Sequence, residues 1–292
     1  MRASCDRNLR LSPLPLRSES VTSKAPSPSK TALQTVAGDH HWHWSSDGDV
    51  WRMKWNDASE RARHLQFVDE LADDLFPWEV AMVDDDTLEI EADEVRPWSS
   101  FSWREARRAT VAGLFESLGT YLRTLHDHGA PEGFGWPDAP TFRHTFNAFM
   151  AAEFESVHRR LQSLDEPLFR EEAIEALASL RRELSAFHPH GRSAWTIGRL
   201  TADRLAVSRT PTRLRACVDF GDVALRPPEF DLASLRIEGL LCGEQSLADR
   251  SFWKGYGAAL TRDLDRRISY FQRLLDLKRR LAAAIHHSER RL

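Results

Sequence analysis

The sequence predicts an α+β protein in which a small β-rich lobe precedes a larger helical lobe. Apolar and polar residues alternate in the manner of strands within residues 40–97, whereas apolar residues recur at helical spacing through most of residues 98–292. A pair of short apolar strands interrupts the helical part, inside residues 195–233. A chain of 292 residues can bury a core of this size, as one large domain or two small ones.

The composition is that of an ordinary soluble globular protein, with 41% hydrophobic and 29% charged residues. The net charge of −4 gives no indication of binding to nucleic acid or to an acidic membrane surface. No apolar run approaches the roughly 18–20 residues that span a bilayer. Cys5, Cys217 and Cys242 are too far apart for a metal-binding spacing, and Cys217 in an apolar strand is typical of a reduced thiol. We therefore expect a cytoplasmic protein that binds neither nucleic acid nor membrane.

Residues 1–39 are rich in Ser, Pro, Arg and Lys and poor in acidic residues. Such a segment buries too little apolar surface to offset its conformational entropy, so we expect a disordered N-terminal tail. An organellar transit segment is the alternative for this composition, whereas the apolar centre of a secretory signal is missing.

Within residues 40–97 the pattern is hairpin, helix, hairpin. Strand-like alternation continues on both sides of Asp47-Gly48, a pair that favours a tight hairpin turn. Residues 57–75 carry the apolar stripe of one amphipathic helix, and residues 80–92 predict a second hairpin around three aspartates. Seven of the ten tryptophans lie between residues 40 and 105, where dense aromatic side chains indicate the core of a small sheet.

The rest of the chain is mainly helical. Helices are expected over residues 104–128, 142–161, 171–187, 231–240 and from 251 to the C-terminus. The interrupting strands are Leu205–Val207 and Leu214–Val218, joined by a basic turn that holds Pro211. The second strand delivers the sequence Asp-Phe-Gly-Asp at its end, beginning at Asp219.

Three motifs in this order resemble the aminoglycoside phosphotransferase and choline-kinase-like family, over roughly residues 40–260. They are the Leu-His that ends a long helix in GTYLRTLHDHG (119–129), the GFGW turn (133–136), and the series LTADRLAV, VDFGDV and PPEFDLASL between residues 200 and 235. The resemblance implies a bilobal protein-kinase-like fold, with a small β-rich N-lobe and a larger helical C-lobe. It also implies ATP and Mg²⁺ as cofactors and a small-molecule or nucleotide ligand.

On the small lobe, the family places a lysine on the third strand to hold the ATP phosphates. The matching residue is Lys54, with a surface strand lysine as the alternative. Arg52 lies on the same strand face as Lys54, and at the position of Arg52 the family has a small residue that packs against adenine. The glutamate that would orient the lysine falls near His64, with Glu60 one turn away. We expect Lys54 to contact the cofactor if a nucleotide binds.

In the catalytic loop, the family sequence His-Gly-Asp-Leu-x-x-x-Asn aligns with residues 197–204. Arg199 then stands where the catalytic base is an aspartate, and Arg204 stands where an asparagine binds magnesium. An arginine cannot accept a proton in a protein, because its pKa stays above about 12, and its charge repels a metal ion. Asp219 keeps the metal-ligand position of the family, with a turn-capping role as the alternative.

Two other arrangements of the loop remain open. Asp203 is the only acidic residue between Glu183 and Asp219 and is a candidate substitute base, although it fits no family spacing. The sequence His190-Gly191-Arg192 gives a second register, which again places an arginine at the base. Outside the loop, Asp231 is expected to cap its helix.

The histidines at 40, 41 and 43 could bind a metal, but no carboxylate or cysteine lies at ligand spacing from them.

Because of the two arginines in the loop, we expect a degenerate family member, either a pseudokinase or an impaired phosphotransferase. It would bind a nucleotide, a phosphorylated ligand or a protein partner between the lobes, with charge from Arg199 and Arg204. Family membership suggests antibiotic resistance, immunity or natural-product maturation as its setting. The alternatives are an active ATP- and Mg²⁺-dependent small-molecule kinase with an atypical base, and a non-catalytic helical interaction protein.

Overall fold

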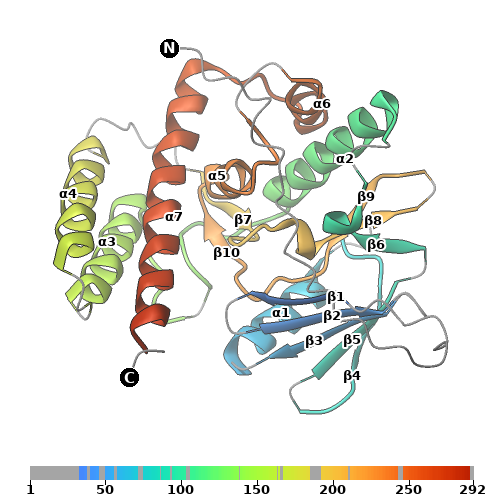
Figure 1. Ribbon diagram of the computed structural model, residues 1–292, viewed down its shortest axis with the longest axis horizontal. Helices are drawn as coiled ribbons and strands as arrows, with labels where there is room; N and C mark the ends of the chain where they lie inside the picture. The colour runs from blue at the N-terminus through green and yellow to red at the C-terminus, as the bar shows by residue number, and fades with distance from the viewer. Residues whose placement is uncertain are drawn as a thin grey trace, which may run out of the picture.

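The computed structural model describes most of the chain from residue 33 onward. The described residues are 33–37, 40–45, 50–55, 58–71, 75–85, 87–92, 94–102, 106–137, 139–162, 164, 167–184, 192–209, 211–242 and 246–289, with side chains from Trp51 on except at 168, 288 and 289. Figure 1 shows a sheet at the lower right and three long helices at the left of the view. The fold is α+β, as expected, with a small sheet region and a larger helical part.

A five-stranded antiparallel sheet forms the small lobe, in the order β1-β2-β3-β5-β4. Its strands are β1 (Leu33–Ala37), β2 (His40–Ser45), β3 (Val50–Trp55), β4 (Val80–Met82) and β5 (Thr87–Glu91), and helix α1 (Ala58–Glu70) connects β3 to β4. Both expected hairpins and the helix between them are confirmed. Leu33–Ala37 differs from the expectation of a disordered tail, because it pairs with β2; the other tail residues lie outside the described ones.

Strand β3 separates its side chains between the two faces of the sheet. Trp51, Met53 and Trp55 are buried, whereas Arg52 and Lys54 are exposed. The buried face packs with α1, whose own buried residues include Phe67. This two-residue alternation is the reason why the segment forms a strand with one covered face.

The larger part holds six α-helices within the described residues. They are α2 (Arg108–Asp127), α3 (Phe146–Gln162), α4 (Pro167–Leu184), α5 (Glu229–Ile237), α6 (Leu247–Tyr256) and α7 (Arg262–Glu289), and a short 3-10 helix η2 (Trp98–Ser100) precedes them. The single C-terminal helix expected from residue 251 is instead two helices. Helix α6 begins earlier, where the Ser246 side chain accepts a hydrogen bond from the Asp249 amide, and it ends at Tyr256, followed by Gly257 in the left-handed conformation.

The interrupting strands belong to one of two small sheets in this part of the chain. Strands β8 (Leu205–Ser208) and β9 (Leu214–Cys217) form the expected pair, and β6 (Val95–Pro97) adds to the edge of β8. Strand β7 (Ala194–Thr196) pairs with β10 (Ala224–Arg226), and η3 (Ala202–Arg204) leads into β8. The chain that follows β9 lies beside helix α1 of the small lobe, where the Phe220 amide donates to the His64 Nδ1. None of the described helices has the length and hydrophobicity of a membrane-spanning segment.

Cys217 and Cys242 give an early test of this packing. Cys217 is fully buried and donates its thiol to the Asp219 carbonyl oxygen at 3.3 Å, and burial raises the pKa of the thiol. Cys242 is exposed. Because the thiolate is the reactive form, we expect iodoacetamide to modify Cys242 and to leave Cys217 unmodified in the native protein at neutral pH. Peptide mass mapping measures both sites, and rapid modification of Cys217 without denaturant would contradict the packing of β9.

Candidate active site

Two arginines and two aspartates form an ionic network where residues 197–204 meet the end of β9, and within the described residues the buried Nη2 of Arg204 has no hydrogen-bond partner. The Nε of Arg204 lies 3.0 Å from Oδ2 of Asp219, and side-chain exposure is 1% for the arginine and 0% for the aspartate. The Nη1 of Arg204 lies 3.4 Å from Oδ2 of Asp222 and donates to the Arg199 carbonyl oxygen at 3.0 Å. The Nε of Arg199 reaches the same Asp222 oxygen at 3.3 Å, but this side chain remains 49% exposed.

The local chain geometry explains how the network forms. Arg204 is the last residue of η3, and its carbonyl oxygen accepts the amide of Val218, so the two chain segments are held side by side. Asp219 follows directly after β9. Burial alone would lower the pKa of the Arg204 guanidinium, but the charges of Asp219 and Asp222 outweigh burial and raise it. Arg204 is therefore a permanent buried cation held by two carboxylates.

The residues at this site do not fit a magnesium ion. Asp219 has one oxygen against the Arg204 guanidinium, and its other oxygen accepts the Gly221 amide at 2.8 Å. Magnesium requires oxygen ligands in near-octahedral geometry, and a guanidinium supplies only donors. Among the described residues there is no group of three or more His, Cys, Asp or Glu side chains that could hold a metal. Because both Asp219 oxygens are engaged by the Arg204 guanidinium and the Gly221 amide, this arrangement does not suit the metal-ligand role expected for Asp219.

Arg199 and Asp203 are the two other residues predicted for the site within this loop, and neither stands in the network as a base. Arg199 is at its edge as a cation. Asp203, half-buried on η3, acts electrostatically on Glu238 at the end of α5: burial raises the pKa of that carboxyl, Arg279 opposes the rise and Asp203 adds to it. Arg204 also acts on Glu238 and opposes the rise, so the adjacent residues Asp203 and Arg204 affect this carboxyl in opposite directions.

Asp231 holds the loop backbone from α5. It is fully buried, and its two carboxylate oxygens accept the amides of Ile197 and Gly198, each at 3.0 Å. His126 at the end of α2 lies with Nε2 3.2 Å from the same carboxylate, and its Nδ1 is 2.8 Å from the Tyr256 hydroxyl. The helix α5 is capped at Pro228 without a side-chain hydrogen bond, so the expected capping role of Asp231 was wrong. Asp231 instead fixes the path of the loop that carries Arg199.

On the small-lobe side, an aromatic contact joins β3 to α1 at His64, near which the glutamate of the family is expected. Lys54 is exposed on the strand face opposite to Trp55. The Trp55 ring lies 5.4 Å from the His64 ring, and the His64 Nδ1 accepts the Phe220 amide at 3.1 Å. Phe220, the aromatic residue of the Asp-Phe-Gly sequence, is fully buried. Helix α1 is therefore joined to this sequence through His64.

Comparison with known proteins agrees with this architecture. A family model described as the phosphotransferase enzyme family matches residues 56–269, well over half of the chain. The chain belongs to the phosphotransferase enzyme family. A search of the curated proteins gave no match.

Solved structures of this phosphotransferase family share the fold at low identity. A choline/ethanolamine kinase family protein from Mesorhizobium loti is 17% identical over 89% of this chain and 80% of that chain, with a TM-score of 0.63. Choline kinase LicA from Streptococcus pneumoniae is 13% identical over 89% and 86%, with a TM-score of 0.57. The ADP-bound aminoglycoside phosphotransferase APH(2'')-Ib is 13% identical over 82% and 81%, with a TM-score of 0.55. The bilobal protein-kinase-like fold of this chain is thus established.

Sequence reasoning missed Asp222, which joins both arginines, and the contact of His64 with Phe220. A signal for Asp222 was present, because a buried arginine requires a counter-charge and Asp222 lies in the same segment as Asp219. No comparable signal marks the histidine contact, which joins residues 156 positions apart. The side chains at 40, 41 and 43 lie outside the described ones, and so does residue 190 of the second register.

Proposed function

We propose that this chain is a catalytically impaired member of the phosphotransferase family, a pseudokinase that binds a ligand between its lobes without transferring phosphate. The observation that carries the proposal is the buried pair of Arg204 with Asp219, at 3.0 Å. Phosphoryl transfer depends on metal ions that neutralise the phosphates and on a base or positioning residue for the acceptor. At these two positions the chain has Arg204 and Arg199.

The ligand that suits this site is one bound without a metal ion. Arg204 is enclosed by protein groups, whereas Arg199 is half-exposed and presents its guanidinium at the edge of the network. Guanidinium groups bind phosphate through charge-assisted hydrogen bonds. We therefore assign to Arg199 the contact with a nucleotide or a phosphorylated ligand, with a protein partner as a further occupant. A cytoplasmic role in antibiotic resistance, immunity or natural-product maturation is the setting that family membership suggests.

Calorimetric titration with ATP tests the proposal directly. We expect the protein to show no magnesium-dependent ATP binding and no release of phosphate, and we expect any nucleotide binding to persist in EDTA. The physical reason is that Asp219 is already neutralised by Arg204. ATP binding that requires Mg²⁺ and is followed by turnover would identify an active kinase with an atypical base and would overturn the proposal.

A variant with the family residues restored sharpens this test. Arg199→Asp combined with Arg204→Asn should create magnesium-dependent nucleotide binding, because the asparagine and Asp219 then supply oxygen ligands. Arg199→Lys combined with Arg204→Lys is the matched control, since it keeps both charges and adds no oxygen. Equal behaviour of the two variants would contradict the assignment of residues 197–204 to the catalytic loop.

A further inference from the structure

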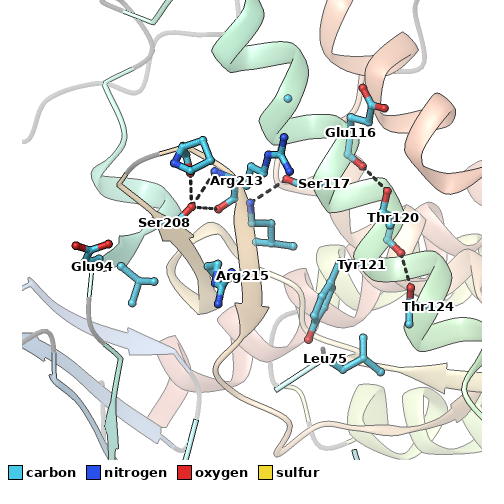
Figure 2. Close-up of a pocket in the computed structure, with 14 residues that line it drawn as sticks. Leu75, Glu94, Glu116, Ser117, Thr120, Tyr121, Thr124, Ser208, Arg213 and Arg215 are labelled. Carbon is cyan, nitrogen blue, oxygen red and sulfur yellow. Dashed lines mark hydrogen bonds between the residues drawn. The ribbon is translucent and has the colours of Figure 1, made fainter. Parts of the chain in front are cut away.

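A cavity of about 770 Å³ lies at the turn end of the β8–β9 hairpin, away from the ionic network at its other end. One wall is a face of α2 and a second is the hairpin, as Figure 2 shows, and Leu75, Glu94 and Val95 complete the lining. None of Arg199, Arg204, Asp219 and Asp222 lines it. Its volume is within the range of about 300–1,000 Å³ that is typical of small-molecule sites. The cavity is thus a second candidate binding site, separate from the Arg199–Arg204 network.

The hairpin wall of this cavity is cationic. Arg213 and Arg215 both line the cavity and both are exposed, with the buried Leu214 between them, and Arg215 stands at an irregularity of the β8–β9 register. Within the part of the chain that the structure describes, neither guanidinium has an ion pair or a side-chain hydrogen bond. They belong to the basic turn noted in the sequence, which the interlobe site does not use. Such a pair is suited to phosphate or carboxylate.

The α2 wall supplies acceptors instead of donors. The hydroxyl of Thr120 donates to the Glu116 carbonyl oxygen at 3.0 Å, and the hydroxyl of Thr124 donates to the Thr120 carbonyl oxygen at 3.1 Å. Because each hydroxyl proton is committed to the helix, the oxygen lone pairs are what these side chains offer to the cavity. The Glu116 side chain adds a carboxylate, which is paired with the Nζ of Lys254 at 2.9 Å. This wall therefore suits ligand groups that donate hydrogen bonds, such as hydroxyls.

Gly113 lies on the same face of α2, and no neighbouring atom packs against it closely enough to require a glycine. A Cβ at this position would have no atom within 4 Å. A glycine in a helix interior costs about 1 kcal/mol relative to alanine, and no close contact offsets that cost here. The missing side chain widens the cavity, and a large residue placed there would occupy it.

We propose that this cavity binds a polyhydroxylated small molecule with one anionic group, a sugar phosphate or a sugar acid. The anionic group, phosphate or carboxylate, contacts Arg213 and Arg215, and the hydroxyls contact Thr120 and Thr124. The two opposed walls, one of donors and one of acceptors, set this orientation. The assignment does not depend on whether the interlobe site is active.

Calorimetry on the full chain tests the site with four probes: glucose 6-phosphate, gluconate, inorganic phosphate and glucose. We expect saturable binding of glucose 6-phosphate or gluconate, and binding at least about tenfold weaker for phosphate and glucose, each of which lacks one end of the ligand. Stronger binding of glucose 6-phosphate identifies a phosphate ligand, and stronger binding of gluconate identifies a carboxylate ligand.

Three variants locate the binding. The double variant Arg213→Ala/Arg215→Ala removes the cationic wall, and Gly113→Leu fills the cavity without touching either arginine; each should weaken binding at least about tenfold. Arg209→Ala is the matched control, because Arg209 is an exposed residue of the same turn that does not line the cavity, and it should bind as the wild type does. Absence of saturable binding by all four probes overturns the proposal, as does a loss in Arg209→Ala equal to that in the double variant.

Discussion

Replacing Arg204 with asparagine is expected to lower the free energy of unfolding by about 3–5 kcal/mol in metal-free buffer, because breaking a buried ion pair leaves an uncompensated charge. Asp219 is fully buried, and Asp222 loses one of its two arginine contacts. Adding Mg²⁺ should restore part of this loss, since two carboxylates and the new amide oxygen then form a set of hard ligands. Chemical denaturation with and without Mg²⁺ measures both effects.

The magnesium dependence of the Arg204→Asn variant separates a structural role of Arg204 from the replacement of a metal. A cation bound at 100 times its dissociation constant stabilises the native state by about 2.7 kcal/mol. Arg204→Met is the matched control, with a similar volume and no oxygen, and should recover less. The wild type should gain nothing, because the guanidinium already neutralises Asp219. A wild type that is stabilised by Mg²⁺ as strongly as the asparagine variant would contradict the idea that Arg204 stands in for the metal.

Much of the fold could be predicted from sequence because its signals are local. The alternation in β2 and β3 and the apolar spacing in α2 each lie within about twenty residues, and all three elements form where expected. The loop at Arg199 and Arg204 was placed by the order of short motifs around it. Periodicity alone could not separate α6 from α7, since the apolar spacing continues while the break depends on the backbone of Gly257.

What could not be predicted is which distant groups meet. The sequence identified Arg204 as a cation offered to a ligand, whereas the folded chain encloses it between Asp219 and Asp222. Pairing of β6 with β8 joins segments about 110 residues apart, and no local pattern specifies it. Lys54 illustrates the same limit, because a motif places it on the strand while the choice of buried face is made by packing against α1.

Gly119→Ala is expected to lower the free energy of unfolding by about 3 kcal/mol, the upper end of the range for overpacked sites. Helices α2 and α6 cross here with almost no space: a Cβ on Gly119 would lie 2.1 Å from the Phe252 carbonyl oxygen and 2.7 Å from the Tyr256 amide nitrogen. Both atoms are backbone, so relief requires the helices to separate. Gly255 faces the same crossing, where a Cβ would lie 1.9 Å from the Glu116 carbonyl oxygen.

Gly113→Ala is the matched control for Gly119→Ala, since it makes the same chemical change six residues earlier in α2. With no atom within 4 Å of its Cβ, only the helix propensity changes, and stability should rise by about 0.5–1 kcal/mol. Urea denaturation of both variants gives the two free energies. A crossing this close also holds Tyr256 against His126, and His126 against the Asp231 carboxylate that fixes the loop. Equal stabilities for the two variants would mean that the helices do not cross at Gly119, and the support of the loop from α6 would fall with that contact.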